Sequence, residues 1–581
     1  MLARTILLPT VLTCFFTACC VAVQPAALHE FQRQQLTDTY YSEGANAGDL
    51  NGDQIADVVY GPYWFAGPDF QTKHEIYNPV PQNVEGYADN FFSWIYDFNQ
   101  DGTNDIFVVG FPGTPAFVYE NPGKDGFDQH WKKHQVFDWV SNESPHFTNL
   151  VGDQKPELVC TRNGFFGYVT IEAGLGEWTF HRISDRVATE RFGHGLGVGD
   201  VDGDGRLDVL VQNGWFRQPE ELVEGKVWEF QRVNFAPAGG AEMYAYDVDG
   251  DGDNDVITSL AAHEFGLSWF EQFEEDGQRL FKEHLIMGSR PQDNRYGVLF
   301  SELHSVNLAD INGDGLQDIV TGKTYWSHHR QSPMWDAGAV VYWFELKRTE
   351  DGVDWIPHKA DGNSGIGRQL IVTDVNNDQL PDMVLGGMKG ANVLLHSRRT
   401  VSADEFQAKQ PKAFSEFQPT SPVIKGKPSK LDTSSGRVPG AIELENAKVL
   451  SSTGNVGSQN MAGFGGGTWS GSQQLFWTGA QPGDQLVLAF EVPKTARYKI
   501  ATVFTKAVDY AVIRVGVDDK PLSEPIDLFH KTVTNSDEIE VGSLDLEAGS
   551  HRLVVQIDGA NPQAVQAYMV GLDYLKLTEA N

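Results

Sequence analysis

Residues 200–210, DVDGDGRLDVL, decide how the rest of the chain is interpreted. Acidic or amide side chains occupy positions 1, 3, 5 and 9 of this stretch, and a short apolar run of β type follows. The pattern returns intact five more times, beginning at Asp49, Asp97, Asp247, Asp310 and Asp374, and a degenerate copy begins at Asn149. Repeats of about 40 to 50 residues with one loop and several strands are typical of radial arrays. Seven copies predict an all-β fold with seven blades.

The loops have the ligand pattern of a calcium site. Oxygen atoms at positions 1, 3, 5 and 9, with a backbone carbonyl at position 7, form the hard ligand shell that calcium prefers. An EF-hand starts in the same way but requires flanking helices and a Glu at position 12, whereas DVLVQN and DIVTG here are strand-like. The remaining alternative is a set of solvated turn residues, which would leave like charges crowded without a cation.

We therefore expect structural Ca²⁺ ions bound by the side chains at these four positions. They are Asp49, Asn51, Asp53 and Asp57; Asp97, Asn99, Asp101 and Asp105; Asp200, Asp202, Asp204 and Asp208; Asp247, Asp249, Asp251 and Asp255; Asp310, Asn312, Asp314 and Asp318; and Asp374, Asn376, Asp378 and Asp382. The degenerate copy has Val151 in a ligand position, so we expect weak binding or none there.

Over residues 30–400 the repeats resemble the FG-GAP or VCBS repeats of calcium-binding β-propellers. The resemblance implies a seven-bladed β-propeller and the calcium roles given above. It says less about activity, because propellers host many unrelated functions. Whether the stretch 30–42 closes the ring by pairing with the last blade is left open.

The two ends of the propeller region differ in composition from the repeats. Residues 1–23 combine an early Arg4 with an apolar stretch, which predicts a secretory signal, and FTAC at 16–19 leaves lipidation of Cys19 as an alternative to plain cleavage. Residues 401–438 are rich in Pro, Ser and Lys, which indicates a linker. The lone Cys160 in the body of the protein excludes structural disulfides within the chain and is expected in the core.

Residues 440–579 return to alternating strands such as LVLAFEV and HRLVVQIDG, which predicts a β-sandwich of jelly-roll type. IELENA near its start and the closing GLDYLKL resemble carbohydrate-binding modules of families 6 and 35. That resemblance implies a structural calcium at Glu443, Glu445 and Asp573. Trp469 and Trp477 are candidates for stacking on sugar rings, with burial in the core as the alternative for each.

A second candidate site lies at the mouth of the propeller channel. Counting six residues back from each copy start gives a largely polar ring of Glu43, Phe91, Glu143, His194, Ala241, His304 and Arg368. Loops between the second and third strands add Trp64, Trp215, Arg217, His263, Lys323, Tyr325 and Trp326. We expect these aromatic and basic side chains to form an exposed platform on one face that binds a polar sugar chain. Elimination from an acidic sugar or keto-sugar needs a base and a positive group. His194, His304 or Tyr325 could be the base; Arg368, Lys323 or a transition metal held by His194, His263 and His304 could stabilise the intermediate.

Two functions remain open. The first is an extracellular or cell-surface carbon–oxygen lyase on carbohydrate, and the fungal aldos-2-ulose dehydratases and some polysaccharide lyases look similar in fold, although no catalytic motif of theirs matches here. The second is a non-catalytic glycan-binding or adhesion protein. A net charge of −35 argues against nucleic acid and anionic membranes as partners. We expect a monomer without a transmembrane segment.

Overall fold

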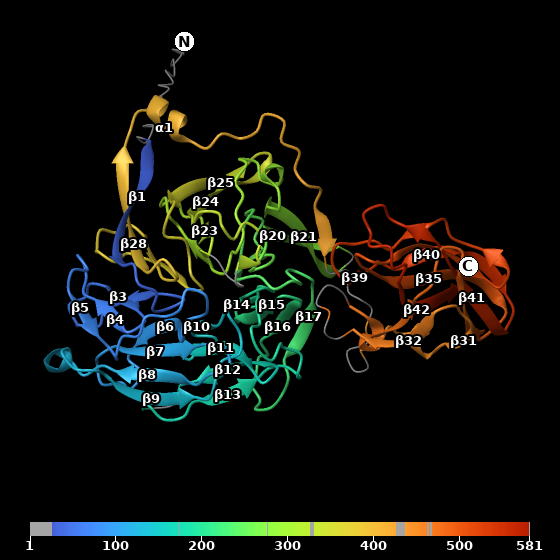
Figure 1. Cartoon of the computed structure of the whole chain (residues 1–581), viewed down its shortest axis with the longest axis horizontal. Coiled ribbons are helices and arrows are strands. Elements are labelled where there is room, and N and C mark those ends of the chain that lie inside the picture. The colour runs from blue at the N-terminus through green and yellow to red at the C-terminus, as the bar shows by residue number, and fades with distance from the viewer. Residues whose placement is uncertain are drawn as a thin grey trace, which may run out of the picture.

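The computed structural model describes residues 26–171, 174–275, 277–325, 330–425, 431, 436–461, 464 and 468–579. The predicted signal sequence with Cys19, and the candidate Trp326, lie outside these residues. The described chain is all-β and comprises a ring of seven four-stranded blades followed by a two-sheet sandwich, which confirms the predicted fold class (Figure 1). Two neighbouring blades, the fourth and the fifth, are joined into one continuous sheet by a short parallel pairing of their first strands.

Each of the first six blades is an antiparallel sheet in chain order. Blade 1 contains β2 (Asn46–Gly48), β3 (Asp57–Tyr60), β4 (Tyr63–Phe65) and β5 (Lys73–Glu75); blade 2, β6 (Asn90–Tyr96), β7 (Asp105–Gly110), β8 (Ala116–Glu120) and β9 (Lys132–Phe137); blade 3, β10 (His146–Thr148), β11 (Glu157–Arg162), β12 (Phe165–Thr170) and β13 (Thr179–Arg182). Blade 4 contains β14 (Leu196–Gly199), β15 (Asp208–Val211), β16 (Gly214–Arg217) and β17 (Glu229–Arg232); blade 5, β18 (Glu242–Tyr246), β19 (Asp255–Ser259), β20 (Leu267–Glu275) and β21 (Gln278–Met287); blade 6, β22 (Val306–Ala309), β23 (Asp318–Gly322), β24 (Val341–Thr349) and β25 (Gly352–Asp361). In every blade the acidic residue at loop position 9 starts the second strand.

The seventh blade joins the two ends of the propeller region. It consists of β26 (Leu370–Thr373), β27 (Asp382–Leu385), β28 (Ala391–Thr400) and the N-terminal strand β1 (Ala27–Thr37). β1 runs antiparallel to β28, from Ala27 opposite Thr400 to Thr37 opposite Ala391. The ring is therefore closed by hydrogen bonds between segments more than 350 residues apart, the arrangement that the sequence alone left open.

Apolar cores form between neighbouring blades. Trp64 of blade 1 is 1 % exposed and packs in a cluster with Ile106 of blade 2, and Trp215 of blade 4 is 2 % exposed in a cluster with Phe270 of blade 5. Both tryptophans stabilise blade packing, which corrects the prediction that they form an exposed stacking surface. Cys160 in β11 is buried in a third such cluster, as expected.

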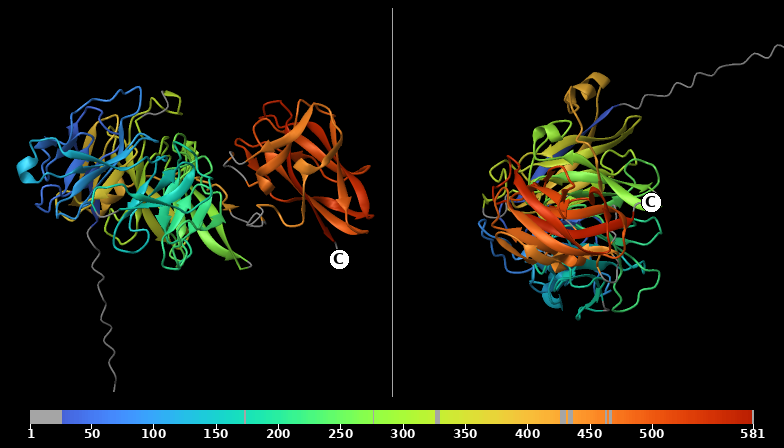
Figure 2. Two further views of the ribbon diagram at one scale, coloured as in Figure 1. Left: turned by 90° about the horizontal axis from the view of Figure 1, so that it is seen from below. Right: turned by 90° about the vertical axis from the view of Figure 1, so that its right-hand side faces the viewer.

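The sandwich has two facing sheets and lies to one side of the propeller (Figure 2). One sheet contains β32 (Asn455–Asn460), β33 (Gln473–Thr478), β42 (Val570–Glu579), β35 (Ala496–Lys506) and β39 (Thr534–Asn535), with β30 (Ala441–Glu443) and β40 (Ile539–Leu546) attached; the other contains β31 (Lys448–Ser451), β34 (Gln485–Val492), β41 (Gly549–Ala560), β36 (Ala511–Val517) and β37 (Lys520–Pro521), with β38 (Ile526–Asp527) attached.

The two candidate sugar-stacking tryptophans of the sandwich are buried. Trp477 is 0 % exposed in the core between the sheets and donates to the Thr453 carbonyl at 2.6 Å. Trp469 is 4 % exposed and donates to Thr505 Oγ1 at 2.7 Å. An indole is large enough to pack in a core and usually finds a partner for its N–H when buried. The stacking role predicted for both residues is therefore corrected.

The segment between the domains contains two short elements. Helix α1 (Ala403–Lys409) is capped by the Ser402 hydroxyl, which accepts from the Glu405 amide. Strand β29 (Val423–Lys425) pairs with β21 and extends blade 5, and Lys425 forms an ion pair with Glu283 at 2.9 Å. The predicted linker is thus anchored to the propeller before the sandwich begins.

Candidate functional site

The calcium loops share one conformation that is built from local hydrogen bonds. In the loop of blade 6, Asp310 accepts from the amides of Gly313, Asp314 and Gly315 at 2.7–3.0 Å, and Asp314 accepts from Leu316. Short polar side chains that accept from amides two to five residues ahead hold the chain in a tight turn. The loops are therefore shaped by their own side chains.

The acid at position 9 also links its loop to the blade. Asp318 accepts from the amide of Ile311 at 3.0 Å and from the amide of Leu346 in the third strand at 2.9 Å. Burial raises the pKa of Asp318 and Asp255 to about 8 and the pKa of Asp105 and Asp208 to about 7. A divalent cation in the loop would favour the ionised form of these carboxyls.

The fourth loop brings three carboxylates together. Ligand oxygens of Asp200, Asp202 and Asp208 lie within 4.8 Å of one another, as do those of Asp247, Asp249 and Asp251 in the fifth loop. Oxygen ligands in this arrangement fit calcium. The degenerate third loop keeps the same turn, because Asn149 accepts from Gly152 and Glu157 accepts from Leu150.

Arg217 belongs to this end of blade 4 and is not with the histidines of the mouth. Its Nε lies 2.5 Å from Asp202 and its Nη2 lies 3.0 Å from Asp204. These ion pairs correct its predicted place in a sugar-binding platform. They also give the fourth loop a cation from the protein itself.

At the opposite end of the inner strands, three histidines converge from neighbouring blades. His194 precedes β14, His263 follows β19 and His304 precedes β22. Their ring centroids are 4.5–5.9 Å apart, and Nε2 of His304 lies 3.0 Å from Nδ1 of His263. One ring nitrogen of each lies within 4.8 Å of the others. The structure thus brings together the three residues named as a metal-binding set.

The chemistry of this set fits a transition metal. Burial lowers the pKa of His194, and it lowers that of His304 well below the usual range, with Arg368 and the neighbouring histidines adding to the effect. Neutral imidazole is the form that binds zinc and related ions. Nε2 of His194 and Nδ1 of His304 are buried without a hydrogen-bond partner. A tetrahedral zinc site needs nitrogens about 3.4 Å apart, given bonds of about 2.0–2.1 Å, so small ring rotations would close the set.

Arg368 lies in the same mouth, fully buried between two carboxylates. Its Nε is 2.9 Å from Glu143 and its Nη1 is 3.1 Å from Glu43. Burial opposes its charge, but the two carboxylates outweigh burial and raise its pKa. Glu143 also lies 3.7 Å from Nε2 of His194. Nη2 of Arg368 is buried without a hydrogen-bond partner, so its N–H pair is not used by the carboxylates.

The other described mouth candidates have contacts of their own. Lys323 is fully buried with Nζ 3.5 Å from Glu302, and burial lowers its pKa. Tyr325 is half-buried, and Nζ of Lys389 lies 4.3 Å from its ring centroid. The structure therefore gives Lys323 an ion-pair partner of its own and sets Tyr325 beside Lys389.

Below the mouth, a carboxyl group that sequence reasoning missed lies in the channel wall. Glu242 on β18 accepts from the amide of Val306 at 2.8 Å and the hydroxyl of Ser305 at 3.2 Å. Burial raises its pKa to about 7. A polar residue in the first strand of a propeller blade was the only sequence signal.

Glu242→Gln is expected to stabilise the protein above neutral pH. A raised carboxyl pKa means that wild-type stability is present below about pH 4.5 and is lost as pH rises through about 7. Glutamine keeps an acceptor for Val306 and has no charge to bury. We expect equal stability at pH 4.5 and a variant more stable by at most about 3 kcal/mol at pH 8.5. Urea unfolding of both proteins at both pH values, in excess calcium, measures the difference. A variant less stable than wild type at pH 8.5 would contradict the prediction.

In the sandwich, the three acids expected to hold calcium lie near one another. Asp573 accepts from the Ser470 amide at 2.9 Å, and the Ser470 hydroxyl donates to Glu443 at 2.5 Å. Burial, together with repulsion from Glu443 and Glu445, raises the pKa of Asp573 to about 8. One oxygen of each acid is buried without a hydrogen-bond partner. These oxygens fit the predicted cation.

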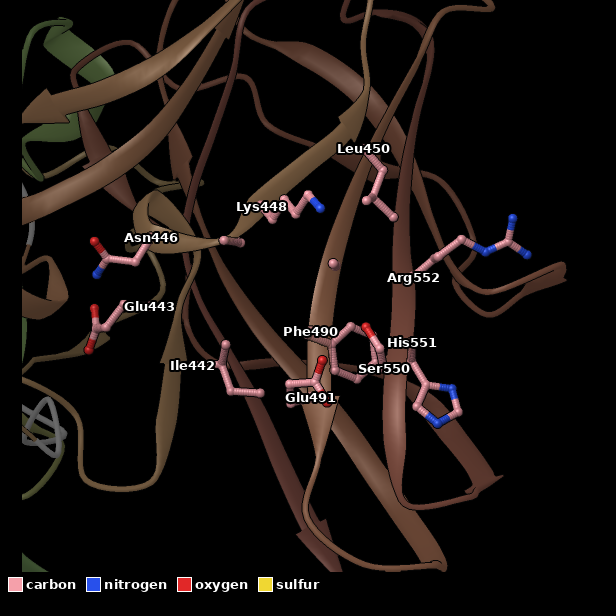
Figure 3. Close-up of a pocket in the computed structure, with 12 residues that line it drawn as sticks. Ile442, Glu443, Asn446, Lys448, Leu450, Phe490, Glu491, Ser550, His551 and Arg552 are labelled. Carbon is pink, nitrogen blue, oxygen red and sulfur yellow. The ribbon is translucent and has the colours of Figure 1, made fainter.

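A groove of about 660 Å³ lies across β31, β34 and β41 of the sandwich (Figure 3). Lys448, Glu491 and Arg552 line it with polar groups, and Leu450 adds an exposed apolar side chain. Outward-facing residues of alternating strands carry no motif, so the sequence did not indicate this groove.

Comparison with known proteins agrees with the propeller. The model of an FG-GAP-like repeat matches residues 149–211. The chain is 25 % identical over 328 residues to human integrin alpha-IIb and 24 % identical over 229 residues to integrin alpha-PS2 of Drosophila melanogaster, covering 45 % and 38 % of this chain. It spans only 30 % and 13 % of those relatives. The comparison thus places one FG-GAP-like repeat at residues 149–211, and the seven blades show the propeller fold.

Among solved structures, a lectin from Agrocybe aegerita is similar over 61 % of this chain and 84 % of its own, with 15 % identity and a TM-score of 0.33. Among the residues that the structure describes, no helix has the length and apolar character needed to cross a membrane.

Proposed function

We propose that this is an extracellular calcium-binding protein whose channel mouth acts on carbohydrate, with His194, His263 and His304 as ligands of a divalent transition metal. The observation that carries the proposal is the convergence of three histidine rings beside a buried arginine. Zinc is the best fit to three nitrogen ligands with an open fourth position. In the calcium loops, the same protein would use oxygen ligands and a different metal.

The reaction class that suits this site is elimination of a carbon–oxygen bond in an acidic sugar or keto-sugar. A bound metal would supply Lewis acidity for a carbonyl or carboxylate oxygen. The free N–H pair of Arg368 can orient the same oxygens, since guanidinium binds carboxylates through parallel hydrogen bonds. If the three histidines bind the metal, Tyr325 is the remaining candidate for the base.

His304→Ala is expected to remove the transition metal and abolish turnover. Partners outside the ligand shell alone contribute about 10–100-fold to metal affinity, so loss of a ligand should cost more than about 100-fold. Metal analysis after dialysis and a mass-spectrometric screen for dehydrated products from acidic polysaccharides and keto-sugars measure both effects. His130→Ala, an exposed histidine of blade 2, is the matched control. Wild-type metal content and activity in His304→Ala would refute the assignment.

A second candidate is a non-catalytic glycan-binding protein, favoured by the polar groove on the sandwich. In that case the screen yields no product from any substrate, while the protein is retained on one glycan. Lys448→Ala with Arg552→Ala should then release it. Products that have lost the elements of water would instead support the lyase function.

A further inference from the structure

A second groove, of about 750 Å³, lies on the rim of the propeller and shares no lining residue with the three-histidine set or with the groove on the sandwich. Strands β24 and β25 of blade 6 form one wall, and the start of β1 with the end of α1 forms the other. Figure 1 shows α1 beside the outer ends of β1 and β28. The start of the predicted linker thus completes a depression that the propeller alone would leave open.

The groove carries an excess of positive charge in an acidic protein. Lys359, Arg398, Lys409 and Lys412 line it and are exposed. Within the described part of the chain, none of these four cations has a carboxylate within 4.0 Å, although 35 other such ion pairs occur there. The chain has a net charge of −35, so carboxylates outnumber cations in it. Four unpaired cations in one depression therefore create a positive local potential on a protein that is negative as a whole.

The acids in the groove wall do not neutralise these cations. Glu345 is bound by Lys347 at 2.6 Å and by His358 at 2.9 Å, Asp314 lies 3.5 Å from the same Lys347, and Glu30 is bound by Arg399 at 3.0 Å. Each of these acids therefore has a partner other than the four cations. The groove keeps an uncompensated positive charge that an anionic ligand can neutralise.

We propose that this groove binds an anionic saccharide chain, one that carries carboxylate or sulfate groups. The four cations would pair with its acidic groups, and Gln410 would offer hydrogen bonds to hydroxyls. A nucleic acid fits less well, because single strands need open aromatic faces for base stacking. Here the ring of Trp343 is covered by His358 at 4.2 Å and that of Tyr342 by Phe300 at 5.5 Å. This inference rests on the proposed function and extends it: an acidic glycan would bind in this groove as well as at the channel mouth.

The test compares two variants of the full-length protein with equal loss of charge. In the groove variant, Lys359, Arg398, Lys409 and Lys412 become Gln. In the control variant, four exposed lysines outside the groove become Gln: Lys124, Lys226, Lys520 and Lys531. Calorimetry at about 50 mM salt with an oligogalacturonate, a neutral oligosaccharide of equal length and a single-stranded oligonucleotide gives the affinities.

We expect the groove variant to bind oligogalacturonate about tenfold more weakly than wild type, because surface ion pairs are individually weak and several are lost together. The control variant should stay within about twofold, and the neutral sugar should bind poorly. Equal affinity of both variants, equal binding of the neutral sugar, or tighter binding of the oligonucleotide would each overturn the proposal. If His304→Ala loses oligogalacturonate binding and the groove variant keeps it, the groove proposal fails while the channel-mouth function stands.

Discussion

Chelation of calcium is expected to lower the Tm of the propeller by about 20 °C. A ligand present at 100 times its Kd stabilises the folded state by about 2.7 kcal/mol per site, so six occupied loops would contribute roughly 16 kcal/mol. For a domain of this size that corresponds to a shift of about 20 °C. We expect the loops to bind calcium only when folded, because the candidate ligands are brought together by the turn and by the blade. Thermal unfolding with and without chelator measures the shift.

The control is a count of the bound ions. Asp378→Ala removes the position-5 ligand of the seventh loop and should reduce the calcium content by one ion, whereas Asp351→Ala, an exposed acid outside the loops, should leave it unchanged. The count also tests the fourth loop, where Arg217 competes for Asp202 and Asp204. An unchanged Tm in chelator, together with no calcium by metal analysis, would refute the calcium interpretation.

Arg368→Met is expected to destabilise the protein by about 3–5 kcal/mol, since removing one partner of a buried ion pair leaves uncompensated charge. Here two carboxylates, Glu43 and Glu143, would lose their common cation. The aliphatic chain of Met would retain contact with Tyr87 and Phe91, over which the guanidinium lies at 5.1 and 5.6 Å. Urea unfolding at pH 7.5 measures the loss.

A second variant separates charge from packing. When Glu43→Gln and Glu143→Gln are added to Arg368→Met, no charge remains to be paired, and most of the lost stability should return. If the triple variant is as unstable as the single one, the effect comes from packing and not from the buried ions. Both variants lack the free N–H pair of Arg368 and should turn over no substrate.

The turns at the proposed calcium loops could be predicted because they are local. All side chains of a loop lie within nine residues, and Asp310 shapes the turn by accepting from amides three to five residues ahead. The same locality preserves the turn of the degenerate third copy despite Val151. The ring of mouth residues also followed from sequence, because each blade places the residue six before its loop at the same height.

The burial and the contacts of individual aromatic and basic side chains could not be predicted from the sequence. Trp64 and Trp215 follow Tyr or Gly in short strands whose pattern suits either exposure or burial, and only the neighbouring blade buries them. Arg217 lies two residues after Trp215, but its strand carries it to the calcium loop of its own blade, where Asp202 and Asp204 bind it.

The sequence by itself determined the repeat, the number of blades, the loop ligands and the sandwich, since these depend on spacing and on alternation along short segments. The tertiary structure decided which distant groups meet: β1 with β28 to close the ring, His263 with His194 and His304, and Arg368 with Glu43 and Glu143. Closure of the ring brings blade 7 against blade 1. A contact of this kind depends on how all seven blades pack, and no local pattern encodes it.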